Sequence, residues 1–128
     1  GGTMSALPQQ IISAWEDRDG AIVFVTVAGD GVPNAIYAGA VGMMGDDSIV
    51  VANNYFDKTL ANIKAGSKGS VLFITKEKKS YQLKGDIEYH EEGPAYDFMK
   101  EWNSPKHPGH AAAVLKVREA YSGATRIV

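Results

Sequence analysis

The sequence predicts a mostly β domain in which six antiparallel strands close a small barrel, with two to three short flanking helices. Its 14 glycines are frequent for 128 residues and cluster between short apolar runs, a pattern typical of a turn-rich β protein. Turns of hairpin length join most neighbouring runs, which favours antiparallel pairing. A chain of this length fits a single domain, residues 1–128.

The first half of the chain predicts one helix followed by three strands. Residues 8–18 carry apolar side chains at helical spacing behind a proline that suits a first turn. Residues 21–27 (AIVFVTV) read as an apolar strand covered on both faces. A hairpin turn at 28–31 leads to a strand over 32–44, where small residues leave room beside the sheet. A short β-branched run at residues 49–51, which ends in Asn53-Asn54, predicts the third strand.

The second half predicts two strands, a helix and a last strand. Residues 70–75 are largely apolar, and residues 80–90 form a long strand in which Gly85 indicates a bulge or bend. Residues 93–102 begin with Gly-Pro and predict a helix. The last strand covers residues 112–121, where alternation between apolar and polar residues is loose.

Composition excludes several classes of function. Without cysteine the chain has no disulfide, no thiol nucleophile and no cysteine-ligated metal, which suits a cytoplasmic protein. The net charge of -2 and the pI of about 5.9 argue against nucleic acid as a partner. No apolar run is long enough for a membrane helix. Residues 1–3 are interpreted as an expression scar ahead of a natural Met4.

The stretch from residue 48 to residue 66 organises the chain. A β-branched run at 49–51 leads through a turn to Asp57, Lys58 and Thr59, which open a helix that ends at Gly66. The free amides of a first helical turn, a lysine and a hydroxyl together suit a phosphate. The alternative is an ordinary helix capped by Asp57, with a lysine on the surface.

No arrangement of residues predicts self-sufficient catalysis. The three histidines are His90, His107 and His110, and Pro108-Gly109 breaks any helix that would align the last two on a metal. We therefore expect surface or hairpin histidines, no metal site and no catalytic side chains. If the protein performs chemistry, a cofactor carries it.

Three segments resemble a known family. They are residues 31–36 (GVPNAI), 48–53 (SIVVAN) and 58–63 (KTLANI), which resemble the FMN-binding split barrels of the pyridoxamine 5'-phosphate oxidase-like superfamily. Within that superfamily, the chain is most similar to the small FMN-binding proteins of anaerobic bacteria, over residues 6–121. The resemblance implies a split β-barrel of the Greek-key type and a homodimer that holds FMN at the subunit interface.

The resemblance also assigns roles to individual residues. Lys58 and Thr59 match the phosphate-binding pair, and Asn62 steadies the turn beside them. Trp102 lies near where the family often brings an aromatic side chain towards the flavin, although an interface or core tryptophan is the alternative. The strand along the isoalloxazine, which bonds the ring edge through backbone groups, corresponds to Asn34, Ala35 and Ile36. The strand end beside the ribityl chain corresponds to Val51, Ala52 and Asn53. Small residues such as Ala38 and Gly39 make room for a flat ring.

The implied function is that of an FMN-binding electron carrier or an oxidoreductase, including a flavin reductase, acting on a small substrate. The alternatives are a flavin-storing or flavin-sensing module without turnover, and a related ligand such as a deazaflavin or haem in the same groove. The implied partners are a second copy and a redox partner. Pyridoxamine phosphate oxidation itself is not expected, because the arginines near the C-terminus, Arg118 and Arg126, lack the Arg-x-His pattern.

Overall fold

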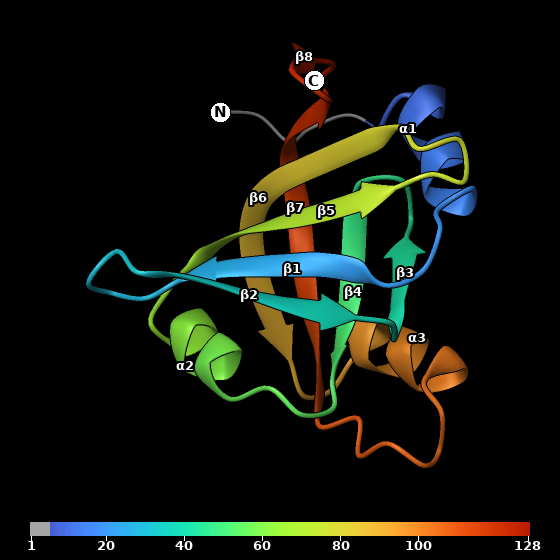
Figure 1. Cartoon of the computed structure of the whole chain (residues 1–128). Coiled ribbons are helices and arrows are strands. Elements are labelled where there is room, and N and C mark those ends of the chain that lie inside the picture. The colour runs from blue at the N-terminus through green and yellow to red at the C-terminus, as the bar shows by residue number, and fades with distance from the viewer. Residues whose placement is uncertain (1–5) are drawn as a thin grey trace.

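The computed structural model describes residues 6–128 as one curled antiparallel sheet with three helices around it (Figure 1). The expected expression scar at residues 1–3 lies outside the described residues. The elements in chain order are α1 (Gln9–Glu16), β1 (Ile22–Val27), β2 (Pro33–Ala38), β3 (Val41–Met44), β4 (Ser48–Asn53), α2 (Lys58–Lys64), β5 (Lys68–Ile74), β6 (Ser80–His90), α3 (Pro94–Trp102), β7 (Ala111–Ser122) and β8 (Thr125–Arg126).

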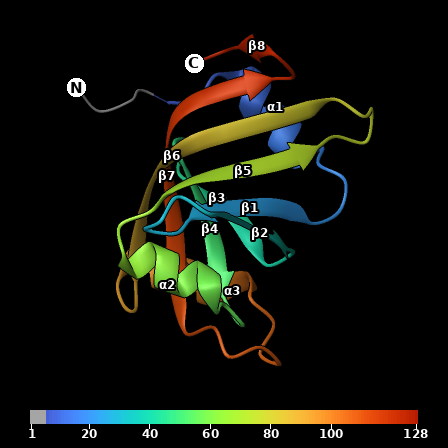
Figure 2. The same cartoon turned by 60° about the vertical axis from the view of Figure 1, so that its left-hand side comes forward.

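The strands pair in the order β2-β1-β5-β6-β7-β4-β3, and the short β8 pairs with β7. The sheet is strongly curled (Figures 1 and 2). Its two edge strands, β2 and β3, are consecutive in the chain. The mostly β, antiparallel split-barrel class expected from the sequence is confirmed. The described residues form eight strands, however, where six were predicted.

Part of this difference comes from the stretch predicted as one strand over residues 32–44. The chain breaks at Gly39-Ala40 into β2, which pairs with β1, and β3, which pairs with β4. The carbonyl of Ala40 accepts a hydrogen bond from the amide of Ala52 at 3.0 Å. The break is where the chain steps from one edge of the curled sheet to the other.

Two apolar layers explain the long buried runs of β4 and β7. Ile49 and Val51 point into the barrel core, whereas Val50 and Ala52 lie in a second cluster with Met99 of α3. In β7, residues 111–115 alternate between the same two layers and are all buried. These strands read as continuous apolar runs because α3 covers their outer face.

β1 has one of its two faces covered within one chain. Within one chain only Ile22, Phe24 and Thr26 are buried, while the side chains at positions 23, 25 and 27 lie on the outer face. The predicted irregularity of the long strand is confirmed, because the β6–β7 register shifts between Lys84 and Gly85. No helix within residues 6–128 is long and apolar enough to cross a membrane.

Candidate functional site

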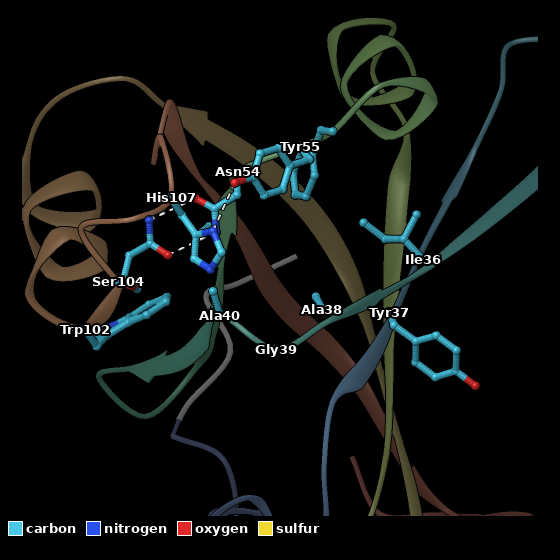
Figure 3. Close-up of a pocket in the computed structure, with 13 residues that line it drawn as sticks. Ile36, Tyr37, Ala38, Gly39, Ala40, Asn54, Tyr55, Trp102, Ser104 and His107 are labelled. Atoms are coloured by element: carbon cyan, nitrogen blue, oxygen red, sulfur yellow. Dashed lines mark hydrogen bonds between the residues drawn. The ribbon is translucent and has the colours of Figure 1, made fainter.

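A groove of about 590 Å³ opens between the β2–β3 edge, the turn after β4 and the end of α3 (Figure 3). Its volume lies in the range of small-molecule and cofactor sites. Figure 3 shows Ile36 and Tyr37 on one side of it, and Trp102, Ser104 and His107 on the other. The lining residues are Ile36, Tyr37, Ala38, Gly39, Ala40, Ala52, Asn54, Tyr55, Phe56, Trp102, Asn103, Ser104 and His107.

The end of the β2 side of the groove, residues 38–40, consists of small residues. A Cβ added to Gly39 would meet no heavy atom within 4 Å. Its neighbours Ala38 and Ala40 are only half-buried, so this segment keeps open space beside the sheet. β2 is also an edge strand that pairs only with β1. Its other edge therefore presents unpaired backbone N–H and C=O groups.

The opposite side is held in place by a pair of asparagines. Asn54 and Asn103 each donate a side-chain hydrogen bond to the other, at 3.0 and 2.9 Å, and Asn54 Oδ1 also accepts the amide of Gly109 at 3.0 Å. Asn103 is buried, so its polar atoms need these protein partners. The pair fastens the loop after α3 to the turn after β4.

Trp102 packs against β3 through a glycine. A Cβ at Gly42 would lie 3.0 Å from Nε1 of Trp102, so only glycine leaves this room for the indole. Nε1 is buried without a hydrogen-bond partner among the described residues. Phe98 contacts the same indole edge-on, with ring centroids 5.7 Å apart. These contacts fix the tryptophan ring in the wall of the groove.

The start of α2 lies next to this groove along the chain. Asp57 precedes the helix, but its side chain makes no capping hydrogen bond, so the ordinary Asp57 cap of the alternative reading is not formed. Thr59 is buried, and its Oγ1 accepts a hydrogen bond from Asn34 Nδ2 at 3.1 Å. Lys58 is exposed and takes part in none of the ion pairs of the described chain.

The family model for pyridoxamine 5'-phosphate oxidase matches residues 9–122. The chain belongs to this family. The resemblance drawn from the sequence is thereby confirmed. The match spans every element from α1 to β7, so it includes all the segments that form the groove.

Members of the pyridoxamine 5'-phosphate oxidase family and similar structures share the whole domain. An uncharacterised protein of Methanocaldococcus jannaschii, MJ0282, is 28% identical over 95% of this chain and 84% of its own length. HupZ of Group A Streptococcus is 21% identical, with a TM-score of 0.77 over 91% of this chain and 93% of its own. An FMN-binding protein of Syntrophomonas wolfei is 24% identical, with a TM-score of 0.73 over 86% and 81%. At these identities the two solved structures show the fold.

The structure brings three of the ten residues singled out for this family member into the groove, namely Ile36, Ala52 and Trp102. Asn53 is buried behind it, where its side chain bonds Tyr89 and the amide of Phe56. The other six do not line the groove. Ala35 is exposed on β2, Val51 points into the core, and Asn62 Nδ2 donates to Thr26 Oγ1 of β1. Lys58 and Thr59 open α2, and Asn34 of β2 bonds Thr59.

Sequence reasoning missed the loop that closes the groove, residues 103–110. It interpreted His107 as a surface histidine, and His107 is exposed, but it did not place this residue in the groove, where it lies beside Ser104. It also stopped at Asn53, although Asn54, Tyr55 and Phe56 continue the same turn towards Lys58 and line the groove. Extending the strand–turn–helix argument through these residues would have found them.

Proposed function

We propose that the chain is an FMN-binding flavoprotein that acts as an electron carrier or as an oxidoreductase, including a flavin reductase, on a small substrate. The groove is the observation that supports this most directly, because it joins the small residues 38–40 to an edge strand with free backbone groups. A planar ring fits beside these small residues. Every second residue of an antiparallel edge strand keeps its N–H and C=O groups free, and such groups within residues 34–36 suit the polar edge of an isoalloxazine.

The phosphate of FMN is assigned to Lys58. This lysine lies two residues after Phe56 of the groove-lining turn and forms no ion pair in the described chain. Thr59 is proposed with it: its Oγ1 accepts a hydrogen bond from Asn34, and its O–H remains able to donate to the phosphate. We assign a structural role to the side-chain hydrogen bonds of Asn34, Thr59 and Asn62, which hold α2 against β1 and β2.

When bound, a flavin supplies hydride and single-electron transfer. The role of the chain is to orient the ring between β2 and Trp102 and to exclude water from the ring face that lies against the groove. Storage or sensing of flavin without turnover is the second candidate, since the groove lining alone carries no side chain that commits the site to turnover. A deazaflavin or haem is distinguished from FMN by the mass and visible spectrum of the ligand that heat releases.

Gly39→Leu is expected to leave the fold intact and to weaken FMN binding by about tenfold or more, equal to about 1.4 kcal/mol. A side chain at position 39 meets no atom of the described chain within 4 Å, so it extends into the space proposed for the ring. Binding is measured by titration of the apoprotein and folding by circular dichroism.

Gly29→Leu is the matched control for this experiment. Gly29 lies in the β1–β2 turn, also with nothing within 4 Å of an added Cβ and outside the groove. The proposal requires the control to bind FMN like the wild type. Equal affinity in all three proteins would place the ring elsewhere.

We also propose that two copies pair through the outer face of β1 and β5. Val27, Leu72 and Ile74 are 40, 41 and 39% exposed there, and Val23 and Val25 continue the same face. Beside them the carboxylate of Asp86 lies 2.6 Å from Lys68 Nζ and 3.1 Å from Arg118 Nε, and these hydrogen bonds lower the pKa of Asp86. An apolar face rimmed by charges is typical of a protein interface.

Leu72→Glu is therefore expected to convert a dimer into a monomer. An unpaired carboxylate buried in an interface costs about 3 kcal/mol or more, so the dimer dissociation constant rises by more than about 100-fold. Light scattering after size-exclusion chromatography measures the mass. Lys79→Ala, in the exposed β5–β6 turn, lowers the net charge by the same one unit off this face and must leave the mass unchanged. A monomeric wild type would contradict the proposal.

A further inference from the structure

Tyr55 and His107 form a hydrogen-bonded pair at the mouth of the groove. The hydroxyl of Tyr55 lies 3.1 Å from Nδ1 of His107, and the two rings meet edge-on with centroids 5.6 Å apart. Tyr55 comes from the turn after β4, and His107 from the loop after α3. Both residues line the groove and both are solvent-exposed, with 72% of Tyr55 accessible.

The scaffold behind this pair is fixed. The residue next to Tyr55 is Asn54, and its double hydrogen bond with Asn103 ties together the two segments that carry the pair. Lys100 Nζ also donates to the carbonyl of Pro108 at 3.2 Å, next to His107. The loop is therefore held at both ends, and the imidazole is presented at a defined place.

The Tyr55–His107 hydrogen bond can run in either direction, according to which imidazole nitrogen carries the proton. A tyrosine hydroxyl that donates to Nδ1 leaves the proton of a neutral imidazole on Nε2. Nε2 lies on the far edge of the ring from Nδ1, so its N–H points away from Tyr55. His107 then offers one N–H donor to whatever lies in the groove.

The rest of the lining selects against charge. None of the described residues that line the groove is aspartate, glutamate, lysine or arginine. Tyr37, Phe56 and Trp102 contribute aromatic surface instead. An anion finds no lysine or arginine in this lining to bind it, whereas a flat apolar ring gains contacts with the aromatic side chains.

We propose that the part of the groove at Tyr55 and His107 is the substrate subsite, and that it binds an uncharged planar aromatic carbonyl compound. The Nε2–H of His107 donates to the carbonyl oxygen, and Tyr55 is the positioning residue that holds the imidazole in this tautomer. The inference rests on the proposed function, because it names the class of substrate that lies beside the flavin.

The test uses FMN-loaded protein labelled with nitrogen-15 and two probes of similar shape, menadione and 1,4-naphthoquinone-2-sulfonate. We expect menadione to shift the imidazole resonances of His107 and to bind at least about tenfold more tightly than the sulfonate. His107→Phe keeps a ring but removes the donor, so menadione affinity is expected to fall about fivefold, as for one hydrogen bond. FMN affinity is measured in parallel for each variant.

His110→Phe is the matched control, because His110 is an exposed histidine of the same loop outside this groove. Tyr55→Phe tests the positioning role: the imidazole spectrum of His107 should lose the Nε2–H tautomer while FMN binding persists. A merely structural role for Tyr55 would leave this tautomer unchanged. The inference is overturned if FMN binds but menadione leaves His107 unshifted, if the sulfonate binds equally well, or if both histidine variants behave alike. A wild type that binds no FMN overturns the proposed function first.

Discussion

Lys58→Ala is expected to weaken FMN binding by about 1–3 kcal/mol, equal to about 5- to 150-fold. Lys58 is exposed, lies two residues after Phe56 of the groove-lining turn, and forms no ion pair within the described chain. A charge-assisted bond from its ammonium to a phosphate is about twice as strong as a neutral hydrogen bond. The loss is measured by isothermal titration of apoprotein with FMN.

Two comparisons separate this contact from a general loss of positive charge. Lys79→Ala removes the same charge from the β5–β6 turn, where Lys79 is 66% exposed, and should leave the affinity unchanged. Riboflavin lacks the phosphate, so its affinity should be the same for wild type and Lys58→Ala. If Lys58→Ala binds FMN as tightly as the wild type, the phosphate lies elsewhere.

The sequence was most informative where local chemistry decides the structure. The helix predicted from Gly93-Pro94 to Trp102 forms as α3, Pro94–Trp102, because a proline favours the first turn of a helix. The break at Gly39-Ala40 had no such local signal. Residues 32–44 read as one strand, and only pairing with β1 on one side and β4 on the other divides them.

The candidate site shows the same division. Ile36 and Ala52 were predicted from strand positions, and both line the groove. The loop carrying His107 depends on the Asn54–Asn103 pair, whose members are 49 residues apart in the chain. No local pattern connects two asparagines over that distance, so the second side of the groove could not be read from the sequence.

Similar apolar runs also arise for different reasons. β4 is buried on both faces because α3 covers its outer side. β1 has an equally apolar sequence, yet its outer face lies open in one chain. The sequence pattern predicts that both faces are covered and leaves open whether a helix of the same chain or a second copy provides the cover.

Gly85→Ala is expected to destabilise the fold by about 3 kcal/mol or more. A Cβ at this position would lie 1.8 Å from the carbonyl oxygen of Lys116 and 3.1 Å from Cα of Val117. Both are backbone atoms of β7, so relief requires β6 and β7 to separate where their register shifts. Urea unfolding followed by circular dichroism measures the change.

Gly29→Ala separates this clash from the general effect of replacing a glycine. An added Cβ at Gly29 meets nothing within 4 Å, so its free energy of unfolding should stay level or rise by up to about 1 kcal/mol, since alanine restricts the unfolded chain. Similar stability in the two variants would mean that β6 and β7 are not in close contact at Gly85. A large loss of stability in Gly85→Ala, but not in Gly29→Ala, means that the bulge predicted at Gly85 requires a residue without a side chain.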